Sequence, residues 1–373
     1  MIDKNRFGIL AVAFVWFTTH FGGGFASGVQ VVQYFVSYGW YALFLPVLSI
    51  AIVTAVLYYA WTFAAIYCTF DYREWGNKYF KPFEALFSNA YEVMYILILL
   101  IASAVAFATG GTVMQQILGT PYVMNTVIVA VCIFFLTIFG ADLVRKAAST
   151  MAVIIIAGML LIYVGNLIVN FPKLLAVLKE APAPASFLDA LWASLKYAGF
   201  QACAMGAYIA VADALKSRED AKKASIWGFI VNAGVLWLAT AGILLHYPAI
   251  LTEKVPVLFV AAHGGGGAIG TAIVSLLIFL AVISTGVSLI FGGARRIVGL
   301  WGKMKGSTVA GDRKVNIAAS LIYVLITWGI ALFGLIPLIA KGYGYTGVLS
   351  FPLLIVPVLL IGVMRSGKWG KEL

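Results

Sequence analysis

The chain has 373 residues, of which 63% are hydrophobic and only 10% are charged, and its mean hydropathy is +1.01. A soluble domain carries about 25% charged residues, so this composition excludes a soluble globular protein and predicts a polytopic membrane protein. A formal net charge of +11 is compatible with a nucleic-acid partner. The distribution of the basic residues along the chain explains this charge by membrane topology instead.

The first apolar segment, residues 7–36, contains the stretch HFGGGFASG, which runs from His20 to Gly28. Each glycine costs about 1 kcal/mol relative to alanine inside a helix. Glycines can also let neighbouring helices pack closely, but three adjacent ones cannot share one helix face. Broken backbone at membrane depth is tolerated where it is buried in protein or lines a polar cavity. The stretch therefore predicts an interrupted helix with a ligand site at the break.

A membrane-spanning helix needs about 20 mainly apolar residues. With the N-terminus inside, 20 of the 25 Lys and Arg residues fall in inner segments, four in outer segments and only Lys196 within a span. Cytoplasmic loops carry such an excess. We therefore predict an all-α polytopic protein with ten transmembrane helices and both termini in the cytoplasm. The ten segments are 7–36, 39–69, 86–118, 121–141, 147–170, 187–215, 224–247, 268–292, 315–337 and 344–364.

The sixth segment is the second one interrupted at mid-depth, by the small and polar run from Ala198 to Gly206. Because five helices precede it, the second half is predicted to be an inverted copy of the first. The repeats are residues 1–178 and 187–373, joined by a Pro/Ala linker at 179–186. Two broken helices at corresponding positions point to a transporter binding site. The apolar loop at 253–267 predicts a short interfacial helix on the outer face, either a moving lid or a passive cover.

At this level the chain resembles the amino acid–polyamine–cation (APC) superfamily with the leucine-transporter fold. That fold has a five-plus-five inverted repeat with helices one and six broken at the midplane. The stretch HFGGGFASGVQVVQYF is most similar to YkvI-like bacterial membrane proteins. The resemblance implies a multi-pass secondary transporter of the bacterial cytoplasmic (inner) membrane that works by alternating access.

The eighth segment carries a residue-level resemblance to sodium-coupled members of the superfamily. Ala281, Ser284 and Thr285 match the positions that supply a carbonyl and two hydroxyls to a sodium ion, with the carbonyls near His20 and Gly23 as partners. Hard cations prefer such oxygen ligands, although neighbouring Ser and Thr are also common helix-packing residues.

Proton coupling is the rival expectation. Some proton-coupled members carry a lysine on helix five, and here residues 147–170 contain none, which favours sodium. His20 titrates near neutral pH, so it is either a proton carrier, a wall of the cation site or a structural group. Ser27 stands where the resemblance expects an asparagine of a second sodium site. Asn232 could contribute there or could join helices.

The two breaks suggest how a substrate would bind. Freed N–H groups at Gly22–Phe25 suit a carboxylate, and free carbonyls near Ala198 suit an ammonium group. Lys196 is either a counter-charge or a lysine that snorkels to the interface. The predicted substrate-binding residues are Gly22, Gly23, Gly24, Phe25, Ser27, Lys196, Tyr197, Phe200 and Gln201.

We therefore predict a sodium-coupled symporter of a small amino acid or a related zwitterion or amine. The alternatives are a proton-coupled carrier that uses His20 and a non-transporting amino-acid sensor of the same fold. No catalytic dyad, metal-binding cluster or P-loop occurs in the sequence, so an enzyme, a cofactor other than sodium and ATP coupling are not expected. The expected partners are a small-molecule substrate and the lipid bilayer, without nucleic acid. The oligomeric state is left open.

Overall fold

The computed structural model of the chain describes residues 4–139, 141–305 and 312–370, and within these ranges it contains helices and no strand. The elements of the first half are α1 (Lys4–His20), α2 (Gly23–Ala26), α3 (Val29–Tyr34), η1 (Val36–Leu43), α4 (Leu45–Tyr67), α5 (Tyr72–Tyr79), α6 (Glu84–Leu118), α7 (Tyr122–Phe139) and α8 (Ala141–Glu180). Those of the second half are α9 (Phe187–Cys203), α10 (Met205–Ile209), η2 (Ala212–Ala214), α11 (Arg218–Leu244), η3 (Ala249–Thr252), α12 (Pro256–Ala261), η4 (Ala262–Gly266), α13 (Gly267–Lys305), α14 (Arg313–Ala331), α15 (Leu335–Pro337), η5 (Leu338–Tyr343), α16 (Gly344–Ser350), η6 (Phe351–Ile355) and α17 (Val356–Arg365).

Within the described residues, each of the ten predicted apolar segments consists of helices. Within the described residues, eight uninterrupted helical stretches are long and apolar enough to cross a membrane, the last of them running from Leu335 to Arg365 through α15, α16 and α17. The other two segments are the interrupted ones, α1–α3 and α9–η2. The all-α polytopic fold is therefore confirmed. The division into repeats at 1–178 and 187–373 stays a prediction.

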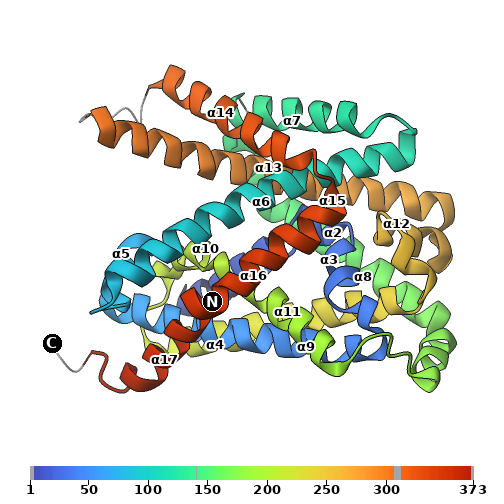
Figure 1. Cartoon of the computed structure of the whole chain (residues 1–373), viewed down its shortest axis with the longest axis horizontal. Helices are drawn as coiled ribbons and strands as arrows, with labels where there is room; N and C mark the ends of the chain where they lie inside the picture. The colour runs from blue at the N-terminus through green and yellow to red at the C-terminus, as the bar shows by residue number, and fades with distance from the viewer. Residues whose placement is uncertain (1–3, 140, 306–311, 371–373) are drawn as a thin grey trace.

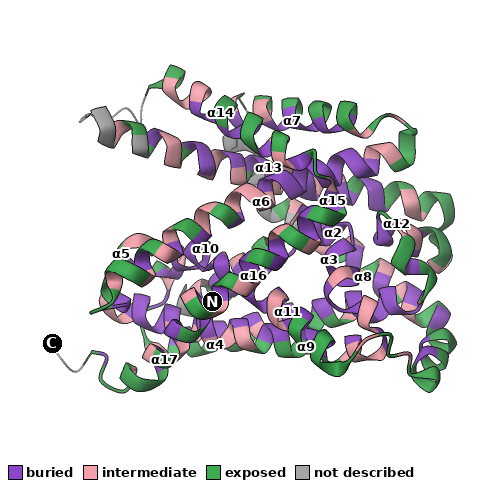
Figure 2. Cartoon of the chain, in the orientation of Figure 1, coloured by how far each residue is buried: buried purple, intermediate pink, exposed green. Residues whose placement is uncertain are grey.

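The helices form two groups with the short helices α2, α3 and α10 of the interrupted segments between them (Figure 1). Helices α7, α13 and α14 lie together along one side, whereas α4, α9 and α11 lie along the opposite side. The short helix α2 packs against α13 in the centre. Figure 2 shows buried residues around this centre and exposed residues on the outward faces of α7 and α14. Large apolar side chains such as Val131, Phe135 and Leu325 are exposed there, as expected of surfaces that face lipid.

The loop at 253–267 contains the predicted short helix, α12, which begins with Pro256 at its first turn. Proline suits that position because its missing N–H would have no helical partner there. Five residues of π-helix, η4, connect α12 to α13. Helix α12 lies over the junction between α2 and α3, where its Val257 N–H donates a hydrogen bond to the Ser27 carbonyl over 3.2 Å.

Candidate functional site

The first segment is interrupted at the glycine run, as predicted. Helix α1 ends at His20, and α2 begins at Gly23 after an extended Gly22. Helix α13 lies directly against these glycines: a methyl group on Gly22 would be 3.2 Å from the Thr285 side chain, and one on Gly23 would be 3.2 Å from the side chain of Val282. The glycines therefore open the helix and also allow α13 to approach the open backbone.

A second break, not foreseen from the sequence, separates α2 from α3. Gly28 has a φ of +82°, a left-handed conformation that favours glycine. The Ser27 hydroxyl donates to the Gly24 carbonyl over 2.8 Å and accepts the Val29 N–H at 3.3 Å. Ser27 is fully buried, so its side chain stabilises the turn and does not line the cavity described below.

His20 joins three helices through its ring. Its Nδ1 lies 2.7 Å from the Asn232 side-chain oxygen and its Nε2 lies 2.6 Å from the Tyr197 hydroxyl. Because the Asn232 amide nitrogen donates to the Gly228 carbonyl, its oxygen is left to accept from His20, and Tyr197 donates to the other ring nitrogen. Both ring nitrogens are thus occupied, so only the backbone carbonyl of His20 is available to a cation. Asn232 acts here as a link between helices.

The sixth segment breaks later than predicted. Helix α9 continues without interruption to Cys203, and the chain departs from the helix only at Ala204, so the expected end near Ala198 was wrong. The small residues before the break form a packing face: a methyl group on Gly199 would lie 2.2 Å from the Gly347 carbonyl oxygen of α16. Small side chains allow such close helix contacts. The carbonyls freed by this break therefore belong to residues near Cys203.

An aromatic layer lies on one side of the two breaks. The rings of Phe200 and Tyr343 are stacked with centroids 4.5 Å apart, and Tyr34 packs against Phe200 at 5.5 Å. The Tyr34 hydroxyl donates to the Ile339 carbonyl over 2.7 Å, which holds α3 against η5. These contacts close the end of the bundle that the sequence predicts to be extracellular.

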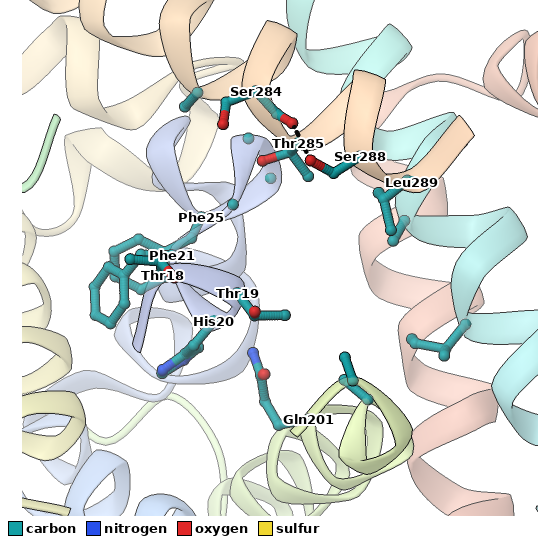
Figure 3. A pocket seen from close by; sticks show the side chains of 18 of the residues that line it. Thr18, Thr19, His20, Phe21, Phe25, Gln201, Ser284, Thr285, Ser288 and Leu289 are labelled. Carbon is teal, nitrogen blue, oxygen red and sulfur yellow. Dashed lines mark hydrogen bonds between the residues drawn. The ribbon is translucent and has the colours of Figure 1, made fainter. Parts of the chain in front are cut away.

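A cavity of about 330 Å³ lies between the breaks and α13 (Figure 3). From the aromatic layer it extends toward Phe14 of α1 and Leu289 of α13, on the side predicted to be cytoplasmic. None of its lining residues is Asp, Glu, Lys or Arg. The predicted site residues that line it are His20, Gly22, Gly23, Gly24, Phe25, Phe200, Gln201, Ala281, Ser284 and Thr285.

Three predicted substrate-binding residues lie outside the lining: Ser27, Lys196 and Tyr197. Lys196 is half-buried on α9, and its backbone carbonyl faces Gly347 of α16. The cavity therefore has no lysine counter-charge in this conformation.

The hydroxyls of α13 face the first break. Figure 3 shows Ser284, Thr285 and Ser288 along one side of the helix, opposite α1 and α2. Ser288 donates to the Ser284 carbonyl over 2.9 Å, the usual local bond of a helical serine. The Ser284 and Thr285 hydroxyls have no hydrogen-bond partner among the described residues. Together with the open backbone at Gly22, they form a set of neutral oxygen atoms of the kind that a sodium ion prefers.

A polar cluster lies at the cytoplasmic end predicted for α6 and α13. Arg296 pairs with Glu92 at 2.9 Å, and the Tyr72 hydroxyl donates to Glu92 over 2.6 Å. Burial raises the pKa of Tyr72, and its bond to Glu92 raises it further. The guanidinium also lies over the ring of Tyr95, 4.6 Å from its centroid. Tyr95 lines the cavity and contacts Gly206 of α10, so the cluster positions one wall of the cavity.

Several lining residues were missed from the sequence. Tyr343 precedes the predicted tenth segment, 344–364, but the structure begins that helix at Leu335. Gln30 and Tyr208 also line the cavity. A polar Gln30 within the apolar stretch VQVV was an available signal, since intramembrane polar residues tend to face cavities or partners.

Comparison with solved structures identifies the fold. The crystal structure of MhsT in complex with L-phenylalanine matches with a TM-score of 0.59 at 15% sequence identity, over 98% of this chain and 93% of that one. A crystal structure of the Eremococcus coleocola manganese transporter, with an aromatic bis-isothiourea substituted compound, matches with a TM-score of 0.52 at 12% identity, over 97% and 86%. No family model and no curated protein matches the chain. The chain has the leucine-transporter fold, as the resemblance implied. The closer similarity to YkvI-like proteins stays a prediction.

Proposed function

We propose that the chain is a secondary active transporter of the bacterial cytoplasmic membrane that couples sodium entry to uptake of a small zwitterion such as an amino acid. The observation that carries the proposal is the pair of unpartnered hydroxyls, Ser284 and Thr285, beside the open backbone at Gly22. Both residues are partly buried and line the cavity, so their hydroxyls are open to a ligand, and a sodium ion bound there would be coordinated by both. The Ala281 and Gly23 carbonyls would complete the ligand set.

An amino acid as substrate is supported by the charge and size of the cavity. Its volume of about 330 Å³ lies near the lower end of the roughly 300–1,000 Å³ common for ligand pockets. Without an Asp, Glu, Lys or Arg in the lining, and with both ring nitrogens of His20 occupied, a solute with a net charge would lack a compensating partner. MhsT, which shares the fold, was crystallised with L-phenylalanine. The Phe25 N–H, which the sequence predicts to be free, donates to the Gly22 carbonyl over 3.0 Å, so the groups left for a carboxylate are the N–H groups of Gly23 and Gly24. A zwitterion between these groups and the carbonyls before Ala204 fits this environment.

The arrangement of the two ends supports alternating access. The aromatic layer of Phe200 and Tyr343 closes one end, while the cavity extends along α1 toward the other end. We infer that this conformation faces the cytoplasm, because the N-terminus is predicted to lie on that side. Rocking of α1–α4 and α9–α11 against the remaining helices would separate the aromatic layer and open the opposite end. No chemical step is required, so we do not propose an enzyme.

A thermal-shift experiment on the purified protein tests the sodium site. We expect sodium chloride, but not potassium chloride, to raise the melting temperature, and the replacements Ser284→Ala and Thr285→Ala to abolish the difference. Ser288→Ala is the matched control, because its hydroxyl already bonds to a carbonyl of its own helix. A sodium-specific shift that survives in the Ser284→Ala/Thr285→Ala double variant would contradict the proposal.

A proton-coupled carrier is the second candidate, and the observation in its favour is the buried chain from Tyr197 through His20 to Asn232. Such a chain places a titratable ring at the cavity wall. Loss of transport in His20→Gln, with sodium-specific stabilisation intact, would favour this candidate. Unchanged transport would identify His20 as a structural link.

A further inference from the structure

Gln30 is a buried polar residue whose side chain has no partner. It lies on α3, two residues after the second break, and only 4% of its surface is exposed. Its side-chain oxygen is buried without a hydrogen bond among the described residues, and the residue lines the cavity. Buried polar groups are nearly always hydrogen-bonded. A buried acceptor without a partner, on a residue that lines the cavity, therefore points to a ligand that supplies the missing donor.

The surroundings of Gln30 hold its amide at the break. A methyl group on Gly24 would lie 2.7 Å from the Gln30 amide nitrogen and 2.7 Å from a methyl of Val105 on α6. Glycine at position 24 thus leaves the space into which the amide folds, between α2 and α6. The amide is confined by its neighbours without being hydrogen-bonded to them, which is the arrangement of a preorganised recognition group.

The other polar groups of the cavity leave a specific task for this oxygen. The His20 ring is occupied by Asn232 and Tyr197, and the Ser284 and Thr285 hydroxyls lie on α13. Gln201 and Tyr208 also line the cavity, from the sixth segment, whereas Gln30 is on the first segment beside α2. With no carboxylate in the lining, an ammonium group must find neutral acceptors. Gln30 offers such an acceptor beside the backbone N–H groups that begin α2, so it could bind the nitrogen of a ligand whose carboxylate lies at those groups.

We propose that the side-chain carbonyl of Gln30 accepts a hydrogen bond from the ammonium group of a zwitterionic substrate. Through this bond the protein selects ligands that carry an ammonium group. This inference rests on the proposed function. It adds the residue that would distinguish an α-amino acid with a free amino group from the corresponding des-amino acid.

The test uses thermal-shift titration of the full chain in sodium chloride. The twenty protein L-amino acids are screened on the wild type, and the most stabilising one is titrated against Gln30→Met, Gln30→Glu and the control Gln33→Met. Gln33 is on the same helix, half-buried and outside the cavity lining. A hydrogen bond to a charged group predicts that Gln30→Met weakens binding about tenfold or more. Gln30→Glu and Gln33→Met should bind within about threefold of the wild type, because glutamate keeps an acceptor in either protonation state.

The des-amino carboxylate of the same amino acid provides a second readout that does not require the variants to fold. The wild type should bind it about tenfold or more weakly than the amino acid, and Gln30→Met should bind it as the wild type does. Equal binding of the two ligands by the wild type would overturn the inference, as would a Gln30→Met variant that binds the amino acid normally, or a Gln30→Glu variant that loses as much as Gln30→Met. The proposed function would survive each of these results. Failure of every amino acid to stabilise the wild type would instead overturn the proposed function and the inference with it.

Discussion

Gly199→Ala tests the contact between α9 and α16 that replaced the expected break. The added methyl would lie 2.2 Å from the Gly347 carbonyl oxygen, whereas ordinary contacts begin at 3.4 Å. Because the atom in the way belongs to the backbone and cannot rotate aside, the two helices must separate by about 1 Å. Overpacking of this kind lowers the free energy of unfolding by about 1–3 kcal/mol. Gly347→Ala is the reciprocal change, because its methyl would lie 2.3 Å from the Lys196 carbonyl oxygen.

Thermal unfolding in detergent measures the effect. Both variants should melt below the wild type, and the double variant should lose less than the sum of the two because one separation relieves both contacts. Gly165→Ala is the control: a methyl there meets nothing within 4 Å, and alanine favours the helix by about 1 kcal/mol. A Gly199→Ala variant as stable as Gly165→Ala would refute the packing argument and restore the possibility of an open helix at this point.

Two further predictions concern polar groups. Asn232→Leu leaves the His20 Nδ1–H buried without an acceptor, so the free energy of unfolding should fall by about 1–3 kcal/mol; an unchanged melting temperature would contradict the assignment of the bond. Glu92→Gln removes the partner charge of the half-buried Arg296, so we expect a loss of about 1 kcal/mol that shrinks as potassium chloride is raised; a salt-independent loss would point to packing instead.

The fold was predictable because its determinants are local and compositional. Apolar length and the asymmetry of Lys and Arg define ten segments without knowledge of tertiary contacts. The break at Gly22–Gly24 was also predictable, since three adjacent glycines disfavour a helix in any environment. Thr285 lies beside Gly22, and the sodium site that the resemblance implies there stays a prediction.

The details that depend on distant partners were not predictable. Gly199 and its small neighbours are equally compatible with a break and with close packing, and only the presence of Gly347 on α16 decides between them. The role of Gln30 depends on the space that Gly24 leaves beside Val105 of α6. The sequence around Gln30 does not indicate that these residues meet. Lys196 was expected near the substrate because its position within the sixth segment predicts a location deep in the membrane. Depth in the membrane does not determine which face of α9 the side chain occupies.

Uptake of a labelled amino acid into proteoliposomes tests the central claim most directly. The amino acid is the one that most stabilises the purified protein, and the gradients are imposed one at a time. We expect uptake under an inward sodium gradient, none under a potassium or proton gradient, and none in the Ser284→Ala/Thr285→Ala variant. Uptake driven by a proton gradient without sodium would contradict sodium coupling, and binding without uptake under any gradient would identify the chain as a sensor.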